Sequence, residues 1–498
     1  MKSSIETDVL VLGAGAAGSA AALSAREAGY DVILLEVSEA TRHTPNFRMA
    51  GAWVMSCPDV PAGLEYLRAC SGGLVDEDML HSWAVESRSL FEWLERYGIE
   101  MRLSEGIRGP EHPEFPGAET LALRRAWTSL PSPIQGQPGW FAPEQACLGG
   151  EALYRGIITA VLNSGAQLFW DSHATSLIIE EGSVTGAKAS IHGHEFEIHA
   201  RGGTVIATGG FGGSSELVQQ FIEVPSTEFY GNPFNDGSGM RLGMSAGADL
   251  VRMNRFIGRG VGAFDDAESG LRLGFILDLN GGGYLIVDGN GDRYMNESRQ
   301  ANLAHDVLYD MTDFDPASGS YPRSPSYYLF DSARLNAGPL TYPDRGVSTV
   351  GLYSWSQDNL KEIASGWIGV GDTPSAAAAA VGANAGHFDE AVTSYNRACD
   401  AGTDSFGRPW ESLVPLRAPF YCVPLFVGGP HTTGGLRRNG QGQVLAALDG
   451  TPITGLYSAG ELGQAIGLLY PIQGCSLSEA FCSGIIAGRN AAREAGHI

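Results

Sequence analysis

Residues 8–18 read Asp-Val-Leu-Val-Leu-Gly-Ala-Gly-Ala-Ala-Gly, a short apolar run that breaks into closely spaced glycines. The run predicts a strand, the small residues of 16–28 predict a helix, and the apolar residues of 30–36 predict the next strand. This stretch is therefore expected to form a strand, a glycine-rich turn, a helix and a second strand.

Each part of this glycine-rich stretch has a physical reason in a nucleotide-binding turn. Gly13 allows the tight turn, Gly15 lets the backbone approach a pyrophosphate, and Gly18 lets helix and strand pack closely. The helix N-terminus supplies N–H donors, and a carboxylate such as Glu36 accepts from a ribose hydroxyl. The pattern predicts a dinucleotide site, and Glu36 disfavours the 2′-phosphate of NADP.

The later part of the chain favours FAD over NAD. Residues 205–210 (Val-Ile-Ala-Thr-Gly-Gly) and 455–461 (Gly-Leu-Tyr-Ser-Ala-Gly-Glu) are both strand-like runs that break into glycine. The second run resembles the strand and turn near the ribityl phosphate in flavoproteins of the glutathione-reductase-like fold. A simple NAD dehydrogenase would not need both ends of the chain for one cofactor, and no second glycine fingerprint offers a separate nicotinamide site.

The patterning predicts an α/β fold with two domains. Residues 62–101 have helical periodicity, 105–145 are rich in Pro, Gly and Glu and are assigned no regular structure, and 167–200 suggest a β-meander. We expect a Rossmann-like FAD-binding domain, discontinuous over residues 1–255 and 429–498. An inserted α+β cap domain for the substrate is expected over residues 256–428.

Composition excludes several classes of protein. The 498 residues are 43% hydrophobic and carry a net charge of −24, which disfavours nucleic acid and anionic lipid as partners. No run is long and apolar enough to span a membrane, and no leader precedes the first strand, so a cytoplasmic location is expected. The seven cysteines have neither disulfide nor zinc spacing, so free thiols and no metal site are expected.

Several further motifs give a family resemblance over nearly the whole chain. They are Asp236-Gly237-Ser238-Gly239 with Gly247-Ala248, Gly291-Asp292-Arg293-Tyr294-Met295-Asn296-Glu297, His431-Thr432-Thr433-Gly434-Gly435-Leu436, and the Gly460-Glu461 turn before a predicted helix at 476–492. With the N-terminal fingerprint, they resemble the fumarate reductase and 3-ketosteroid dehydrogenase flavoproteins. The resemblance implies one FAD between the nucleotide-binding body and a mobile cap, with the substrate against the flavin.

The resemblance also implies a set of cofactor-binding positions. These are Gly13, Gly15, Ala16, Ala17, Gly18, Glu36, Val37, Asn46, Ala50, Gly51, Ala174, Ala207, Thr208, Gly209, Asp236, Gly239, His431, Thr432, Gly460, Glu461, Ser476 and Leu477. Residues 42–44 (Arg-His-Thr) resemble the segment whose histidine holds FAD covalently in succinate dehydrogenases. Their register differs by about one residue, so non-covalent FAD is expected.

Three departures from the fumarate reductase pattern argue against fumarate, succinate or aspartate as substrate. Ala301 stands where those enzymes have a proton-delivering arginine, and Pro471 stands where they have a dicarboxylate-binding arginine. Pro430 replaces a substrate-binding histidine. The charged and polar contacts expected for a dicarboxylate are therefore lost.

Residues 470–474 (Tyr-Pro-Ile-Gln-Gly) instead resemble the Tyr-Pro-x-x-Gly of 3-ketosteroid Δ1-dehydrogenases. The resemblance implies that the Tyr470 hydroxyl and the Gly474 N–H hold a substrate ketone. The α carbon would lose a proton to a protein base, and the β carbon would pass hydride to flavin N5. Two fixed donors stabilise developing enolate charge more than they stabilise the ground state. We expect desaturation of a cyclic ketone, either a 3-ketosteroid or a smaller ring such as 4-oxocyclohexanecarboxylate.

The proton acceptor and the electron acceptor stay open. Arg299 lies close to the family's proton-handling position, and His305, Tyr309, Tyr327 and Tyr328 are further candidates. Arg259 lies where fumarate reductases have another substrate histidine, and would suit a substrate that carries one carboxylate. A quinone, an electron-transfer protein or oxygen would each serve as electron acceptor. The alternatives are an ene-reductase fed by a separate electron carrier and a non-catalytic flavin-binding partner protein.

Overall fold

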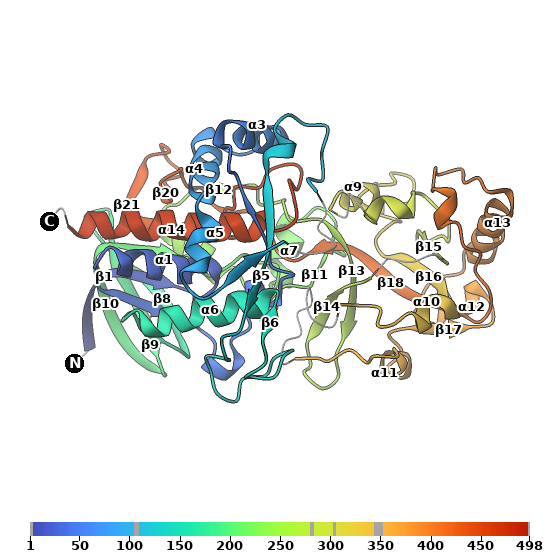
Figure 1. Cartoon of the computed structure of the whole chain (residues 1–498), viewed down its shortest axis with the longest axis horizontal. Helices are drawn as coiled ribbons and strands as arrows, with labels where there is room; N and C mark the ends of the chain where they lie inside the picture. Colours follow the sequence, from blue (N-terminus) through green and yellow to red (C-terminus); the bar gives the residue numbers. More distant parts are fainter. Residues whose placement is uncertain (1–2, 104–108, 279–282, 302–304, 343–351, 497–498) are drawn as a thin grey trace. The chain divides into compact units, whose positions relative to one another are not determined.

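Two main sheets organise the chain, and each belongs to a separate unit (Figure 1). The computed structural model describes residues 3–103, 109–278, 283–301, 305–342 and 352–496. The first unit comprises Met1–Leu217, Phe234–Arg255 and His431–Ile498, and the second comprises Val218–Pro233 and Phe256–Pro430. The second unit thus takes in residues 218–233, which the sequence alone does not separate from the nucleotide-binding body.

The sheet of the first unit has the predicted strand–turn–helix at its centre. Parallel pairing gives the order β21 (Pro452–Ser458), β10 (His194–Ile206), β1 (Ser3–Leu12), β2 (Val32–Leu35) and β7 (Gln167–Phe169). Antiparallel β20 (Gln443–Leu445) lies beside β21, and β8 (Ser172–Glu180) and β9 (Ser183–Ile191) form the predicted meander with β10. The carboxyl ends of β1, β10 and β21 therefore meet at one edge, where ligands bind in open parallel sheets.

Two helices from opposite ends of the sequence pack together in this unit. In Figure 1, α14 (Cys475–Ala495) runs beside α1 (Ala16–Glu27). A Cβ at Gly484 would overlap the carbonyl oxygen of Ala17, and one at Gly488 would overlap that of Ala21. The two glycines let the backbones approach closely, and the Ser24 hydroxyl donates to the carbonyl of Ile485 at 3.1 Å. The C-terminal helix is thus fixed against the helix that opens the nucleotide-binding turn.

The expectation of no regular structure over 105–145 is wrong in part. Residues 104–108 lie outside the described part. The segment then forms η2 (Ala118–Thr120) and β5 (Ala122–Thr128). β5 pairs with β3 (Trp53–Ser56), β4 (Glu100–Arg102) and β6 (Cys147–Leu148) in one sheet. Pairing with strands distant in sequence makes β5 a strand, and composition carries no sign of those partners. The remaining elements of the unit are η1 (Ala40–Arg42), α2 (Asn46–Met49), α3 (Val60–Ser71), α4 (Glu77–Ser87), α5 (Leu90–Glu95), α6 (Gly150–Asn163), α8 (Ser238–Ser245), β12 (Leu250–Val251) and β19 (Gly435–Leu436), while α7 (Ser215–Phe221) crosses into the second unit.

The second unit is built around one long strand. β18 (Phe420–Gly429) pairs with β13 (Arg259–Asp265) and β16 (Ser326–Asp331), and the order of the sheet is β14-β13-β18-β16-β15. A run of alanines forms most of α12 (Pro374–Ala380). The remaining elements are β11 (Glu228–Phe229), β14 (Arg272–Ile276), β15 (Tyr284–Val287), η3 (Glu297–Ala301), α9 (Val307–Met311), α10 (Ser332–Asn336), α11 (Leu360–Ala364), β17 (Gly369–Gly371), α13 (Phe388–Ala401) and η4 (Trp410–Ser412).

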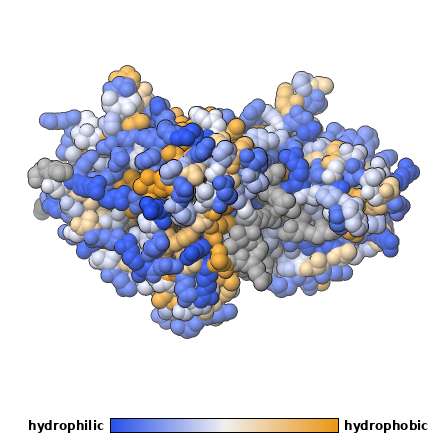
Figure 2. Space-filling model, turned by 45° about the horizontal axis from the view of Figure 1, so that its top comes forward, coloured by the Kyte–Doolittle hydropathy of each residue, from blue (hydrophilic) through white to orange (hydrophobic). Residues whose placement is uncertain are grey.

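The face drawn in Figure 2 matches the charged composition. Hydrophilic residues predominate on the face drawn in Figure 2, and hydrophobic residues form smaller groups among them. Within the described ranges, no helix is both long and apolar enough to cross a membrane. The seven cysteines are free thiols.

Candidate functional site

The glycine turn has the geometry that its sequence predicts. Gly13 has φ +97°, and a Cβ there would lie 2.6 Å from the carbonyl oxygen of Ala207, the residue that follows β10. A Cβ at Gly18 would overlap the carbonyl oxygen of Gly13, whereas one at Gly15 would meet no described atom within 4 Å. The space in front of Gly15, the N-cap of α1, is therefore open, and no side chain caps this helix.

The Glu36 carboxylate faces this turn. Its Oε2 accepts from the N–H of Ala14 at 2.8 Å, and its Oε1 accepts from the N–H of Ser38 at 2.9 Å. The side chain is buried. Two backbone donors thus hold an acceptor beside the N-terminus of α1, where a ribose hydroxyl would need one.

A second carboxylate, Glu461, accepts hydrogen bonds from several polar groups. Its Oε1 accepts from Asn46 Nδ2 at 2.6 Å, and its Oε2 accepts from Asn235 Nδ2 at 3.2 Å and from the N–H of Gly210 at 3.3 Å. Gly460 lies against Ala17, because a Cβ at Gly460 would be 2.9 Å from the Ala17 Cβ. Predicted positions from three distant segments of the first unit therefore converge on the start of α1.

A polar chain links the His-Thr segment to the start of α14. The His431 ring Nε2 lies 2.9 Å from the Ser476 hydroxyl, which also bonds the side-chain oxygen of Gln464 at 3.3 Å. The Thr432 hydroxyl accepts from the N–H of Phe211 at 3.1 Å, just beyond the end of β10. These contacts hold the predicted residues His431, Thr432 and Ser476 at the same edge of the sheet.

A buried ion pair fixes α14 behind this edge. Arg438 lies 2.5 Å from Glu479, and its guanidinium also donates to the carbonyl of Ser458 at 2.9 Å. Burial raises the pKa of Glu479, and burial also lowers the pKa of Arg438. A pair buried in this way is costly to break, because the remaining charge would have no partner.

The other predicted cofactor positions lie in the same unit. Gly239 packs on Thr208, since a Cβ at Gly239 would overlap the Thr208 hydroxyl, and Asp236 accepts from the N–H of Ser238 at 2.9 Å. Gly209 has φ +79° and faces the Asn235 side chain. Ala174 lies on β8, Ala50 and Gly51 follow α2, Leu477 lies in the first turn of α14, and Val37 is exposed.

The residues present fit FAD. The open space at Gly15, the uncapped start of α1 and the held carboxylate of Glu36 suit a pyrophosphate and a ribose. In addition, the buried hydroxyl of Thr208 has no hydrogen-bond partner among the described residues, although buried hydroxyls normally have one. A bound dinucleotide would satisfy these groups.

The loop that carries Tyr470 is held from two sides. The carbonyl of Pro471 accepts from the Tyr66 hydroxyl at 2.7 Å and from the N–H of Glu111 at 3.0 Å. Tyr470 is half-buried and its hydroxyl bonds the thiol of Cys475. Burial raises the pKa of that thiol, so it is protonated at neutral pH.

Gly474 ends this loop and begins α14. It has φ +81°, and a Cβ there would overlap the carbonyl oxygen of Trp53, so only glycine fits. Across the described residues, its N–H donates to no acceptor. The loop therefore presents a tyrosine hydroxyl and a free backbone N–H three residues beyond Pro471.

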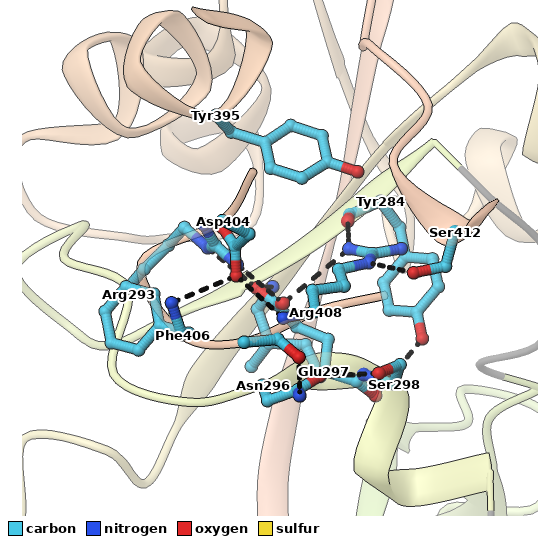
Figure 3. A network of polar contacts seen from close by, with 12 residues as sticks. Tyr284, Arg293, Asn296, Glu297, Ser298, Tyr395, Asp404, Phe406, Arg408 and Ser412 are labelled. Atoms are coloured by element: carbon cyan, nitrogen blue, oxygen red, sulfur yellow. Dashed lines mark hydrogen bonds and ion pairs between the residues drawn. The ribbon is translucent and has the colours of Figure 1, made fainter. Parts of the chain in front are cut away.

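In the second unit, the Arg-Tyr-Met-Asn-Glu motif forms a buried network (Figure 3). Arg293 donates to both oxygens of Glu297, at 2.8 and 2.9 Å, and to Asp404 at 2.6 Å. Arg408 lies 3.6 Å from Glu297 and donates to the carbonyl of Tyr284 at 2.7 Å. The motif residues thus bind one another and anchor the start of η3.

The predicted catalytic arginines lie in different surroundings. Arg259 is half-buried and bonds the Tyr230 hydroxyl, and no described carboxylate lies within 4 Å of it. Burial raises the pKa of Tyr230 to about 12, so the tyrosine is a neutral partner. Arg299, in contrast, is exposed and lies 3.5 Å from Asp310.

The other candidate proton acceptors also differ in burial. Tyr327 and Tyr328 are buried in β16, and burial raises the pKa of each. His305 and Tyr309 lie around the start of α9, and Tyr309 is exposed. The side chain of Ala301 lies outside the described part.

Several residues of the site carry no local signal in the sequence. Asn235 bridges to Glu461, Gln464 bonds Ser476, and Tyr66 bonds Pro471, which is far from it in sequence. An asparagine, a glutamine or a tyrosine alone predicts no such role. Only the folded chain brings each to its partner.

The first unit thus brings segments from both ends of the chain together around the start of α1. The chain belongs to the family described as FAD binding domain, whose model matches residues 8–477. It binds FAD and is an oxidoreductase of that family.

Named relatives include both dehydrogenases and reductases. The chain is 26% identical to 4-oxocyclohexanecarboxylate 2-dehydrogenase of Sinomonas cyclohexanicum, over 98% of this chain and 93% of the relative. It is 25% identical to urocanate reductase of Eggerthella lenta, over 98% of this chain and 75% of that protein. In structure it resembles 3-ketosteroid Δ1-dehydrogenase of Sterolibacterium denitrificans in complex with 1,4-androstadiene-3,17-dione. The TM-score is 0.81 at 21% identity, covering 98% of this chain and 99% of that one, which shows a shared fold.

Proposed function

We propose that the protein is an FAD-dependent dehydrogenase that introduces a double bond next to the ketone of a cyclic substrate. The observation that carries the proposal is the loop 470–474, which presents the Tyr470 hydroxyl and the unbonded N–H of Gly474. The named relative that acts on 4-oxocyclohexanecarboxylate supports a cyclic keto substrate.

Two donors on one ketone oxygen explain how the loop would act. Removal of a proton from the α carbon places negative charge on that oxygen, and donors that are already in position stabilise the charge without reorganising. The hydroxyl of Tyr470 exchanges its bond to the Cys475 thiol for one to the ketone. When bound, FAD supplies the acceptor for the hydride that leaves the β carbon.

The bonds to Pro471 keep these donors in place. Tyr66 and the backbone of Glu111 come from two different segments, and both donate to the same carbonyl. A loop fixed at its centre loses little freedom when the substrate binds, which lowers the entropic part of the barrier.

We assign Arg259 to the carboxylate of a keto acid substrate. Its guanidinium has a neutral partner in Tyr230, and no described carboxylate lies within 4 Å of it, so its charge is available to an anionic group. The proton acceptor stays among Arg299, His305, Tyr309, Tyr327 and Tyr328, of which Arg299 already has an ion-pair partner.

The reductase relatives support a second candidate, the reduction of an enone or unsaturated acid by electrons from a separate carrier. The same two donors would stabilise the same enolate in that direction. FAD bound without a covalent link is proposed for either direction, because His43 lies beside Glu36, 3.6 Å from the carboxylate proposed for the ribose.

The test is Tyr470→Phe, with Tyr97→Phe as the matched control. The Tyr97 hydroxyl bonds the exposed Glu27 at 2.7 Å, so its loss removes a tyrosine hydroxyl elsewhere. Loss of one oxyanion donor lowers kcat for ketone oxidation by about 10²- to 10³-fold. The control is expected to keep its kcat, and both variants are expected to keep the flavin spectrum. Equal kcat in Tyr470→Phe and wild type would overturn the assignment.

A further inference from the structure

His43 is a buried titratable group with no part in the proposed reaction. Its side chain is 2% exposed and packs against the rings of Tyr154 and Trp170, with centroids 5.5 and 5.0 Å away. It lies between η1 and α2, beside the carboxylate of Glu36.

A chain of hydrogen bonds sets which ring nitrogen of His43 carries the proton. Among the described residues, the buried Tyr154 hydroxyl lies within hydrogen-bond distance of two nitrogens: the Gln137 amide nitrogen at 2.9 Å, which can only donate, and His43 Nδ1 at 3.2 Å. The hydrogen of this hydroxyl therefore donates to Nδ1. Nδ1 is therefore an acceptor, and in the neutral ring the proton is on Nε2. Burial lowers the pKa of His43 to about 4, which keeps the ring neutral at pH 7.

The Nε2–H of His43 lies next to the carboxylate of Glu36 but does not form a hydrogen bond with it. Nε2 lies 3.6 Å from Glu36 Oε2, which is longer than a hydrogen bond. The nitrogen is buried and has no hydrogen-bond partner among the described residues. A buried donor left unsatisfied is costly, so its place beside this carboxylate requires an explanation.

We propose that His43 is a positioning residue for the adenosine ribose of FAD, acting through Glu36. When the ribose hydroxyl binds, the Nε2–H of His43 takes up the free lone pair of Oε2 and fixes the carboxylate toward the hydroxyl. The other donors to this carboxylate are backbone groups, those of Ala14 and Ser38. His43 is thus the side chain that tunes the ribose contact.

The test compares FAD with an analogue whose adenosine ribose lacks the 2′-hydroxyl, on the full chain stripped of FAD. The quantity measured is the ratio of the two Kd values, because a merely structural role of His43 would weaken both ligands equally. Wild type is expected to prefer FAD by about tenfold or more, as for a hydroxyl bonded to a carboxylate. His43→Leu is expected to lose about tenfold of that preference.

Two further variants keep the proposal falsifiable. His43→Gln keeps a donor near the place of Nε2 and is expected to retain the preference. Tyr154→Phe removes the donor to Nδ1, frees the ring to place its proton there, and is expected to lose part of the preference. Tyr97→Phe, with its hydroxyl at Glu27, is the control and is expected to match wild type. An unchanged ratio in His43→Leu and Tyr154→Phe, or no preference in wild type, would overturn the proposal. No substrate is needed, so the outcome is independent of the proposed reaction.

Discussion

Acidification is expected to destabilise the fold through His43. Burial lowers the pKa of this residue to about 4 from an ordinary value of 6.5. The unfolded chain therefore takes up a proton at a higher pH than the folded chain does. The stabilising contribution is complete above pH 6.5, and it is lost as the pH falls toward about 4.

The size of this effect follows from the difference between the two pKa values of His43, 6.5 in the unfolded chain and about 4 in the folded chain. Each pH unit between the two pKa values costs about 1.4 kcal/mol of the free energy of unfolding, so the whole window costs about 3 kcal/mol. Glutamine at position 43 cannot titrate. His43→Gln is therefore expected to lack this part of the pH dependence, while every other titrating group is unchanged.

The assay is urea unfolding of wild type and His43→Gln at a series of pH values between about 7.5 and about 4.5. Tryptophan fluorescence follows the unfolding, because the chain has nine tryptophans, of which Trp170 has its ring 5.0 Å from the His43 ring. As the pH falls across this range, the free energy of unfolding of wild type is expected to decrease more than that of His43→Gln. The extra decrease is expected to be most of the about 3 kcal/mol. Parallel pH profiles would refute the reasoning, since they would show that His43 titrates alike in the folded and unfolded chains.

Three further predictions concern the cofactor turn, the second unit and the substrate loop. Gly15→Ala is expected to keep the Tm of wild type, because its Cβ enters only open space, and to bind FAD about tenfold or more weakly. Gly18→Ala is expected to lower the Tm as well, because its Cβ would overlap the Gly13 carbonyl oxygen. Thermal unfolding and fluorescence titration with FAD check both variants. Glu297→Gln is expected to cost about 3–5 kcal/mol in the stability of the second unit, measured by chemical unfolding, since it removes the buried partner of two arginines; an unchanged stability would contradict this role. Tyr66→Phe is expected to lower kcat about tenfold with unchanged FAD affinity, because the Pro471 carbonyl loses one of its two donors; a fall in FAD affinity alone would contradict it.

The nucleotide-binding half of the fold could be predicted because its signals are local. The apolar run before Gly13, the small residues of α1 and the strand that ends near Glu36 follow one another within a short stretch, and each has a steric reason. The meander of β8, β9 and β10 and the final helix also follow from periodicity within the segment itself.

Elements that depend on distant partners could not be predicted. β5 is surrounded by Pro- and Gly-rich sequence and exists because β3, β4 and β6 pair with it. The contact of His43 with Tyr154 and that of Tyr66 with Pro471 join segments far apart in the sequence. No local pattern encodes such proximity, so neither contact could be predicted, although the sequence singles out His43 and Pro471 individually.

The most direct test of the central claim is anaerobic mixing of the purified flavoprotein with saturated cyclic ketones. The panel comprises a 3-ketosteroid, cyclohexanone and 4-oxocyclohexanecarboxylate, and the quantity followed is the absorption band of the oxidised flavin. The account predicts that a saturated cyclic ketone bleaches this band, and that the keto acid does so faster in wild type than in Arg259→Leu. No bleaching by any ketone, together with reoxidation of the chemically reduced protein by enones, would contradict the dehydrogenase claim and establish the reductase direction.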